Sequence, residues 1–457
     1  MDVRAFIRRY SDLLSAVALA ALSLLYHIWI FRFGAHPFGY DTGFYRRFLI
    51  EPATSLPSAA VPGLGDDALG PRLLLDLLRL IGQNSLIDFS PDIILYGSYL
   101  ALFAALPVLI YVLLSRMDRR IALTAGVLVA LSSVQYEAYW FMYWKSAFAL
   151  CLLFLALIAL ERRSRYLLAG LDIAIALSHK TTAALFVMIL GAYALLSRRL
   201  EIVAHIILTA SVLALVALPS FVETAQTRPS GMFLDWFAFF ELVIPFLILI
   251  AGANRLLLSL RYPMSVVAFS SVVLLYPILH LPFYERVFLY ADVALCIFAA
   301  AALICIVDAV RARLDITAWL MLATVAIAFG LFAENVLTAF HSKGPLIPEA
   351  SIERIERIGA LIPEGATLLT TSNEAPWYEG WTSAHIAAPG MLRDTHSYEE
   401  WEYIWGEATE AERIAFLGEF DHPLYISTLD GIEYLVGTPP SCLRALAPDL
   451  LVDECQR

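Results

Sequence analysis

Long apolar stretches follow one another through the first three quarters of the chain, from Leu13 to about Leu337. A helix needs about 20 residues to cross roughly 30 Å of hydrocarbon, and a helix satisfies its own backbone hydrogen bonds there. The pattern predicts eleven membrane-spanning helices, at about 11–32, 91–114, 120–135, 146–160, 166–178, 181–197, 201–219, 236–254, 262–280, 287–307 and 316–338. The chain is therefore predicted to be a polytopic membrane protein with a mostly α-helical fold.

Basic residues gather in alternate connections between these stretches. Under the predicted count they fall on one side: Arg4, Arg8, Arg9, Arg116, Arg119, Arg120, Arg162, Arg163, Arg165, Arg198, Arg199, Arg255, Arg261, Arg311 and Arg313. The positive-inside rule predicts that this side faces the cytoplasm. We expect an integral plasma-membrane protein with a cytoplasmic N-terminus, an uncleaved first helix and, because the number of spans is odd, an external C-terminus.

Composition divides the chain into two parts. The whole chain is 60% hydrophobic and only 16% charged, whereas soluble domains carry about 25% charged residues. From His341 onward there are 20 acidic and 7 basic residues, a net charge of −13, so the total of −11 leaves +2 for the remainder. We therefore predict a membrane domain at 1–340 and a soluble, acidic domain at 341–457. This acidity argues against nucleic acid as a partner.

The acidic C-terminal part has the pattern of an α/β domain. Isoleucines at helical spacing predict a helix at 351–359, and further helices are expected around 397–405 and 409–419. Strands are predicted at 366–371, 425–429 and 432–436. In an oxidising compartment Cys442 and Cys455 could close a short disulfide loop, which would contribute about 3 kcal/mol. We expect this extracytoplasmic domain to contact the acceptor or to cap the site.

The first outer loop, about 34–90, is long enough to have structure of its own. After Pro71, polar residues recur every three or four positions among leucines, which predicts an amphipathic helix on the outer membrane surface. Near its start the loop carries Asp41, within Gly39-Tyr40-Asp41-Thr42-Gly43. An acid this close to the membrane is a candidate for chemistry on a lipid-borne substrate, although Asp before Thr-Gly is also a common turn former.

Two of the predicted helical hairpins are short. Residues 120–135 extend about 24 Å and residues 166–178 about 20 Å, less than the hydrocarbon thickness. Charged residues lie at both tips: Glu137 and Lys145 flank an aromatic run, and His179 and Lys180 adjoin in the second tip. Ionisable groups at membrane depth are costly unless they line a polar cavity, so we predict a recessed pocket that opens outward. The alternative is that both helices extend further and these charges lie in the interface.

Together these features resemble the GT-C superfamily, the integral-membrane glycosyltransferases that take sugars from polyprenyl-phosphate carriers. Asp41 corresponds to the family's first-loop acid, which implies that it is the catalytic base. The family often has a second adjacent acid, but this chain has Thr42 there, and Glu137 is the candidate for a second acid. The resemblance also implies phosphate binding by the cations at the outer tips: Lys145, His179, Lys180 and Arg286.

The chemistry of glycosyl transfer suits one carboxylate. A base must take the proton of the acceptor hydroxyl, and displacement without a carboxylate nucleophile inverts the anomeric centre. Cations stabilise the departing phosphate. Arg286 follows Tyr284 and Glu285 in a predicted outer turn, where it binds phosphate or, alternatively, pairs with Glu285 or Asp292. Tyr45 is a candidate for stacking on sugar or isoprenoid.

The sequence therefore predicts an inverting glycosyltransferase that moves a monosaccharide from a polyprenyl phosphate to a glycan, lipid or protein acceptor at the outer membrane face. No cofactor is expected. We predict no metal requirement because the outer loops lack a cluster of acids typical of oxygen-ligand sites, with a divalent cation as the alternative. Two other functions stay open, namely a lipid-linked oligosaccharide polymerase or ligase, which would depend on arginines, and a secondary transporter, which would show two related halves.

Overall fold

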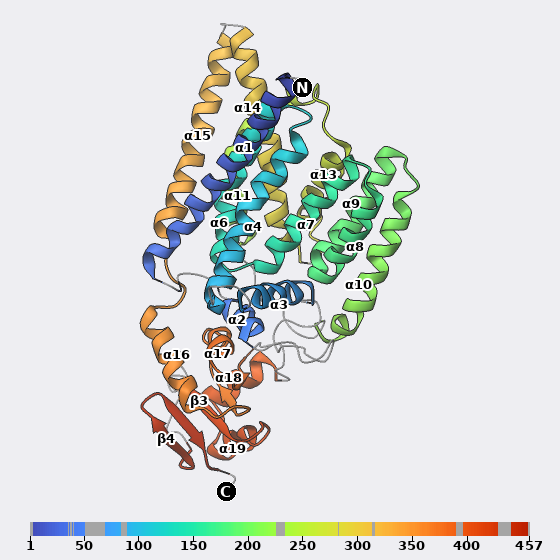
Figure 1. The fold of residues 1–457 in the computed structure, drawn as a ribbon. Coiled ribbons are helices and arrows are strands. Elements are labelled where there is room, and N and C mark those ends of the chain that lie inside the picture. The colour runs from blue at the N-terminus through green and yellow to red at the C-terminus, as the bar shows by residue number, and fades with distance from the viewer. Residues whose placement is uncertain are drawn as a thin grey trace.

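The computed structural model describes residues 3–34, 36, 39, 41–50, 69–83, 89–224, 234–281, 283–312, 316–389, 396–427 and 440–455. Helices at all eleven predicted positions form one elongated bundle (Figure 1). They are α1 Val3–Ile28, α4 Pro91–Leu114, α5 Arg119–Ala130, α7 Trp144–Glu161, α8 Arg165–Ser178, α9 Lys180–Ser197, α10 Ile202–Thr224, α11 Trp236–Gly252, α13 Met264–Ile278, α14 Phe288–Ala312 and α15 Ile316–Ser342. Short elements join some of them: η1 Trp29–Phe33, α12 Asn254–Leu257 and η3 Tyr284–Val287.

Fewer helices than predicted are long enough to span a membrane unaided. Six in the described part of the chain meet both the length and the apolarity of a span, or seven if α5 and the helix that follows it count as one. Three more, in α10, α11 and α13, are apolar but shorter. The protein is thus a multi-pass membrane protein in which long and short apolar helices pack side by side.

The helix predicted at 120–135 needs a correction. Its first part is α5, and after a bend of 41° the chain continues as α6 Ser133–Trp140. The bend follows from local chemistry, because the Ser132 hydroxyl caps α6 by accepting the amides of Val134 at 3.2 Å and Gln135 at 3.4 Å. Most of the aromatic run therefore lies in α6, beyond the predicted end of the helix at residue 135.

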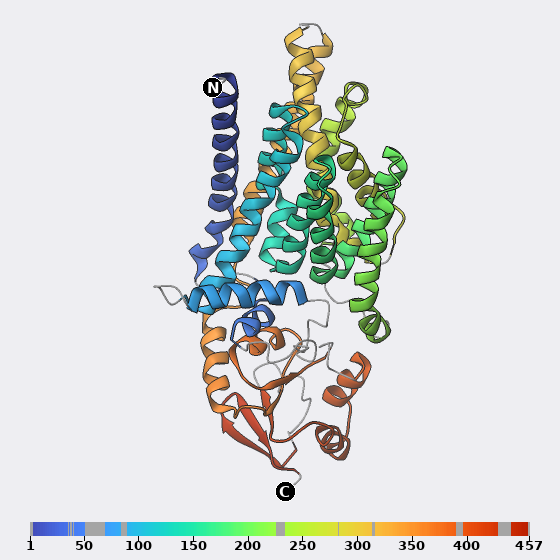
Figure 2. The same ribbon diagram turned by 45° about the vertical axis from the view of Figure 1, so that its right-hand side comes forward.

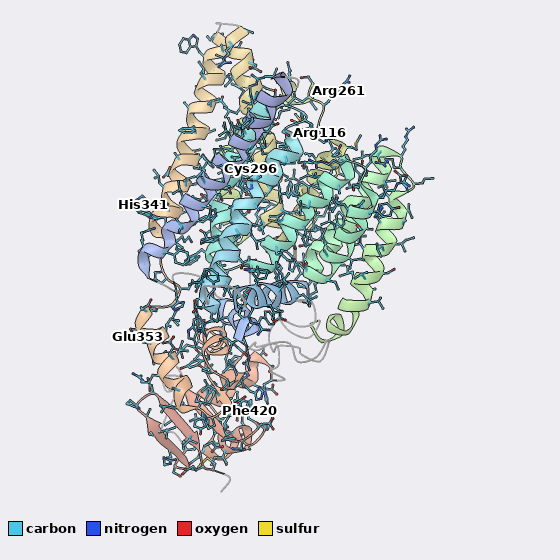
Figure 3. All side chains as sticks on the ribbon, in the orientation of Figure 1. Arg116, Arg261, Cys296, His341, Glu353 and Phe420 are labelled. Atoms are coloured by element: carbon cyan, nitrogen blue, oxygen red, sulfur yellow. A yellow bond between two sulfur atoms is a disulfide. The ribbon has the colours of Figure 1, made fainter. Side chains whose placement is uncertain are left out.

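The two ends of the bundle differ in what they carry. The N-terminus lies at one end (Figure 1), as do Arg116 and Arg261 (Figure 3), and the C-terminal domain lies at the other. At that second end, α2 Thr42–Ile50 and α3 Leu69–Gln83 cross between the bundle and the C-terminal domain in both ribbon views (Figures 1 and 2). Helix α3 confirms the amphipathic helix predicted after Pro71, with Leu75 buried and Leu73 and Leu77 exposed.

The C-terminal domain is α/β, as predicted. Its elements are α16 Glu349–Leu361, β1 Thr367–Leu369, α17 Ala375–Trp381, β2 His385–Ala387, α18 Tyr398–Gly406, α19 Glu410–Leu417, β3 Leu424–Ser427, β4 Leu443–Ala447 and β5 Leu450–Asp453. The sheet has the order β2-β1-β3-β5-β4, with β2, β1 and β3 parallel and the last two pairings antiparallel. The predicted strand at 432–436 lies outside the described residues. The prediction did not include α17, β2, β4 or β5.

The apolar core does not stop at the predicted domain boundary. One cluster of buried side chains joins Phe44 and Tyr45 of α2 and Leu95 of α4 to Ile355 of α16 and Trp377 of α17. The other face of the sheet has its own cluster, in which α18 and α19 cover the strands. Burial of apolar surface is the main favourable term in folding, so the shared cluster joins the C-terminal domain to the bundle as one packed unit.

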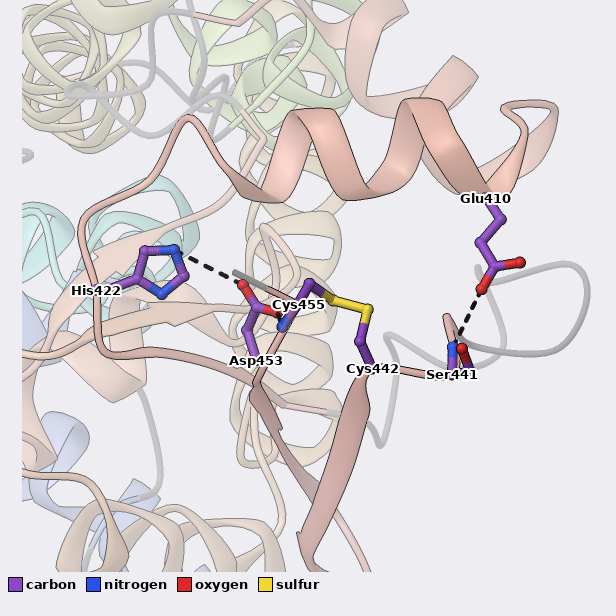
Figure 4. The surroundings of a disulfide bond; sticks show 6 residues. All are labelled: Glu410, His422, Ser441, Cys442, Asp453 and Cys455. Atoms are coloured by element: carbon purple, nitrogen blue, oxygen red, sulfur yellow. Dashed lines mark hydrogen bonds and ion pairs between the residues drawn. A yellow bond between two sulfur atoms is a disulfide. The ribbon is translucent and has the colours of Figure 1, made fainter. Parts of the chain in front are cut away.

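A disulfide between Cys442 and Cys455 links the start of β4 to the end of β5 (Figure 4). It confirms the pairing that the sequence allowed. Beside it, the Cys455 amide donates to the Asp453 carboxylate at 2.8 Å, and the His422 Nε2 lies 3.8 Å from that carboxylate.

Candidate functional site

Asp41 lies at the start of α2, in a loop that is fixed against the turn between α6 and α7. Its carbonyl accepts the amide of Tyr45 at 3.3 Å, and the Gly39 amide donates to the Trp140 carbonyl at 2.9 Å. Gly39 has φ +100°, and a Cβ there would lie 2.0 Å from the Thr42 hydroxyl oxygen and 2.7 Å from the Met142 Cβ. Only glycine tolerates both the backbone and the crowding, so the sequence before Asp41 determines a tight, packed loop.

The Asp41 carboxyl is partly open to solvent but crowded by protein. Burial raises its pKa to about 6, against the opposing effect of the positive charges of Lys145 and Arg286. The charges of two cations would by themselves lower the pKa of a carboxyl, so desolvation is the stronger effect here. At pH 7 the group is mostly ionised, yet it is a stronger base than an ordinary aspartate.

The positive charges of Lys145 and Arg286 act on this carboxyl from different parts of the bundle. Lys145 is the second residue of α7, and Arg286 lies in η3, directly before α14. Both side chains are partly exposed. Asp41, Lys145 and Arg286 therefore form one electrostatic group, built from three segments that are far apart in sequence, and we call it the Asp41 cluster.

Of the two acids predicted as alternative partners of Arg286, Asp292 bonds other residues, and a pair with Glu285 stays a prediction. Asp292 is fully buried and accepts hydrogen bonds from the Ser132 hydroxyl at 2.9 Å and the Gln135 amide at 2.8 Å. The Arg286 guanidinium instead lies 5.7 Å from the centroid of the Phe283 ring. Phe283 has a positive φ of 61°, an uncommon conformation for a bulky residue that helps to turn Arg286 at this end of the bundle.

Tyr284 and Glu285 share the η3 turn with Arg286. The Tyr284 ring lies 5.0 Å from His280 and 6.3 Å from Trp236, measured between ring centroids. Both Tyr284 and Glu285 are partly exposed. Both residues lie next to Arg286 in sequence, at a place where aromatic rings from α11, from the turn after α13 and from α14 pack around Tyr284.

Tyr45 lies beneath the cluster rather than on its surface. Its side chain has no exposed area, its ring centroid lies 5.9 Å from that of Trp144, and its hydroxyl accepts the Lys145 amide at 3.4 Å. The sequence predicted that Tyr45 stacks on a substrate, but in this structure the Tyr45 ring has no exposed face on which a substrate could stack. Tyr45 instead ties α2 to the start of α7 and so fixes Lys145 relative to Asp41.

His179 and Lys180 lie at the joint between α8 and α9. His179 is buried, and its Nδ1 lies 2.8 Å from the Thr182 hydroxyl, which also bonds Tyr290 of α14. Lys180 begins α9 and is partly exposed. These hydrogen bonds make His179 part of a network between α9 and α14. The charges that act on Asp41 come instead from Lys145 and Arg286.

Glu137 pairs with a residue beyond the last bundle helix. Its Oε1 lies 2.7 Å from the Lys343 ammonium, which also lies 4.3 Å from the centroid of the Trp140 ring. Trp140 in turn donates its indole N–H to the Gly344 carbonyl at 2.7 Å. Glu137 thus joins α6 to the connection that leads into the C-terminal domain, and a role as a second acid stays a prediction.

The sequence analysis missed the contribution of Tyr143 and of α17. Tyr143 lies in the turn before α7, where the charges of both Asp41 and Arg286 act on it. Helix α17 packs directly on α2. The aromatic run in the sequence indicates this turn, but no signal in the sequence connects residues 375–381 with residues 42–50.

A group of potential metal ligands occurs among the described residues at Cys442, Asp453 and Cys455, far along the chain from Asp41. The two cysteine sulfurs are bonded to each other. They are therefore not available as thiolate ligands.

No protein-family model and no curated protein matches the sequence, whereas several solved structures match the fold. The oligosaccharyltransferase of Archaeoglobus fulgidus in the apo form aligns with a TM-score of 0.64 at 13% identity, over 93% of this chain and 70% of that one. ArnT from Cupriavidus metallidurans aligns with a TM-score of 0.55 at 12% identity, over 95% and 97% of the two chains. This chain has the GT-C fold.

A third GT-C structure extends the comparison to a larger protein. The arabinofuranosyltransferase AftD from Mycobacteria aligns with a TM-score of 0.59 at 16% identity, over 94% of this chain and 37% of that one. One Archaeoglobus fulgidus structure holds an inhibitory peptide and a dolichol-phosphate, and another is tethered with an acceptor peptide. The GT-C fold that the sequence resembled is thereby confirmed, with both the helical bundle and the C-terminal domain inside the aligned region.

Proposed function

We propose that this protein is an inverting glycosyltransferase that moves a monosaccharide from a polyprenyl phosphate to an acceptor at the extracytoplasmic face of the membrane. The observation that supports this most is the Asp41 cluster, in which desolvation raises the pKa of a carboxyl to about 6 against the opposing charges of two cations. The GT-C fold supports the same class of reaction, and one of its members was solved with dolichol-phosphate.

In the proposed step Asp41 accepts the proton of the acceptor hydroxyl. The acceptor oxygen forms a bond to the anomeric carbon while the bond from that carbon to the phosphate oxygen breaks. The electron pair leaves with the prenyl phosphate, whose second negative charge is met by Lys145 and by the planar fork of Arg286. A single displacement with one base inverts the anomeric configuration.

The raised pKa fits this role. A base is most effective when its pKa is near the working pH and it is still ionised. Desolvation supplies the basicity, and the two cations keep the carboxyl from being protonated at neutral pH. The same cations face an anionic donor, so one arrangement serves both the base and the leaving group.

His179, Lys180, Tyr284 and Glu285 are proposed as further donor contacts, and Tyr45 as a support for Lys145. The N-terminus is proposed to be cytoplasmic, because Arg116 and Arg261 lie at the end of the bundle away from the C-terminal domain. We expect activity to persist in the presence of a chelator, because Lys and Arg can stabilise a monophosphate without a metal.

Mass spectrometry of lipids that co-purify with the protein tests the proposal. We expect a prenol that carries one sugar through a monophosphate, enriched in Asp41→Asn relative to the wild type because the variant keeps the donor without consuming it. An oligosaccharide on a diphosphate would instead support the polymerase or ligase. If neither lipid is retained by either protein, the proposed donor class is wrong.

A further inference from the structure

Helices α2 and α17 approach each other more closely than side chains normally allow. A Cβ added to Gly43 would lie 1.7 Å from the Pro376 carbonyl oxygen, and one added to Gly380 would lie 2.5 Å from the Gly43 Cα. Backbone therefore rests on backbone at this crossing, as happens where small residues meet. Gly43 is two residues after Asp41, so the crossing lies within the first turn of the helix that begins at the proposed base.

Two arginines of α2 extend this contact beyond the glycines. Arg47 is buried and its Nη1 lies 2.5 Å from Glu379, which has no exposed surface, and 3.2 Å from the Ala384 carbonyl. Arg46 donates to the Gly380 carbonyl, and its guanidinium lies 4.5 Å from the centroid of the Trp381 ring. A buried charge is costly unless it is paired, so this pair fixes α2 and α17 in one relative position.

A second contact reaches the same loop from the opposite direction. Lys343 and Gly344, in the connection between α15 and α16, hold Glu137 and Trp140 of α6. The Trp140 carbonyl then accepts the amide of Gly39, two residues before Asp41. The segment from Gly39 to Gly43 is therefore held at both of its ends by groups that lead to the C-terminal domain.

We propose that the C-terminal domain positions the Asp41 carboxylate through these two contacts. Arg47, Glu379 and Lys343 are its positioning residues, and Glu137 acts with Lys343. The inference rests on the proposed function, in which Asp41 is the base. It gives the domain a part in turnover that does not require it to touch either substrate, because a base that moves by about 1 Å can lose roughly 100-fold in rate.

Glu379→Gln in the full-length protein tests the first contact. Asp449→Asn is the matched control, since Asp449 is a buried acid of the same domain whose ion-pair partner, Arg357 at 2.5 Å, belongs to α16 rather than to α2. With the donor found in the lipid extract, we expect at least a tenfold loss of turnover in Glu379→Gln and wild-type turnover in Asp449→Asn. Farnesyl phosphate should bind both variants within about twofold of the wild type.

Lys343→Met tests the second contact in a protein that keeps the buried Arg47–Glu379 pair. Lys343 is partly exposed, so this variant answers the question if Glu379→Gln does not fold. We expect lower turnover with unchanged farnesyl phosphate binding. We also expect the acid limb of the pH–rate profile to move, because a shift of the loop before α2 changes the surroundings of Asp41. Glu379→Asp should recover part of the turnover lost in Glu379→Gln.

Two results would overturn the inference. In the first, Glu379→Gln and Lys343→Met turn over as fast as Asp449→Asn. In the second, the two variants lose farnesyl phosphate binding in parallel with turnover, which is what a merely structural contact would give. Failure of the proposed function is distinguishable, because it would show as full turnover in Asp41→Asn whatever the two positioning variants do.

Discussion

Charged residues pair at both ends of the helical bundle, and the two sets differ in how much water reaches them. At the end near the N-terminus, Arg120 and Asp308 lie 2.8 Å apart with side chains 53% and 46% exposed. At the junction with the C-terminal domain, the Arg47 and Glu379 side chains are 7% and 0% exposed. Exposed pairs gain little because water solvates the separated charges well, whereas breaking a buried pair leaves an uncompensated charge.

This comparison separates two uses of charge in one membrane protein. The exposed arginines suit a role in topology, which depends on their number and side rather than on any one partner. The junction depends on individual partners, since each buried group has a defined counter-charge. Substitutions at the junction should therefore have specific effects on turnover, and substitutions at the other end should not.

The largest effect is expected for Asp41→Asn, compared with Asp118→Asn at the start of α5. Asp118 also begins a helix, where its carboxylate accepts the amides of Arg120 and Ile121. We expect the rate of sugar transfer to fall by about 10²- to 10⁴-fold in Asp41→Asn, because the general base is lost, and to stay unchanged in Asp118→Asn.

The folded state of Asp41→Asn should be at least as stable as the wild type. The Asp41 pKa is raised above its unfolded value, so ionisation opposes folding as the pH rises through about 4 to 6, and asparagine avoids that cost. A lower melting temperature at pH 7 together with the rate loss would indicate damage to the fold and would weaken the assignment of Asp41 as base.

Arg286→Ala is expected to have the next largest effect, with Arg261→Ala as its control at the opposite end (Figure 3). Loss of a cation that meets the departing phosphate should lower turnover by about 10²- to 10³-fold, and Arg286→Lys should recover a part of it. Steady-state rates with the prenyl-phosphate donor measure this. Equal losses at Arg286 and Arg261 would remove the distinction between the two ends.

Stability offers a comparison that does not depend on the donor. Glu379→Gln should lower the free energy of unfolding by about 3–5 kcal/mol, because Arg47 is left buried without its counter-charge, whereas Asp308→Asn should change it much less. Denaturant titration in detergent measures the free energy of unfolding of both variants, with tryptophan fluorescence as the signal, to which Trp377 and Trp381 of α17 contribute. Similar values for the two variants would show that burial does not distinguish these pairs.

The smallest effect is a shift in pH dependence. The ionised form of Asp41 is the base, so kcat/KM should fall as the pH drops through about 6 and stay level above it. Because the charge of Lys145 opposes the rise in the Asp41 pKa, Lys145→Met should move this limb to higher pH, whereas Arg116→Met at the opposite end should not. A limb that stays fixed in Lys145→Met would mean that it reports another group.

The sequence predicts the helical part of the fold well because membrane spans have a strong and simple signal. All eleven predicted segments correspond to helices, and the amphipathic pattern after Pro71 corresponds to α3. The sequence prediction did not include the break between α5 and α6, where the Ser132 hydroxyl that caps α6 also donates to Asp292, 160 residues away. Pairing across such distances has no local pattern.

The candidate site was predictable residue by residue but not as an arrangement. Asp41, Lys145 and Arg286 were each identified from the predicted outer loops, and the structure brings their charges together. Glu137 was predicted as a second acid because Thr42 stands where the family often has an adjacent acid, while its partner Lys343 belongs to a different segment. The contact between α2 and α17 had no sequence signal, because Gly43 and Gly380 have no distinguishing feature until their helices cross.

That crossing limits how the two parts of the molecule can be exchanged or separated. A chimera that replaces residues 341–457 with another protein's domain would need a residue without a side chain opposite Gly43 and an acid within reach of Arg47. Grafting α2 together with the new domain would meet both conditions at once. The natural unit for engineering is therefore a discontinuous module, made of the short helix α2 and residues 341–457.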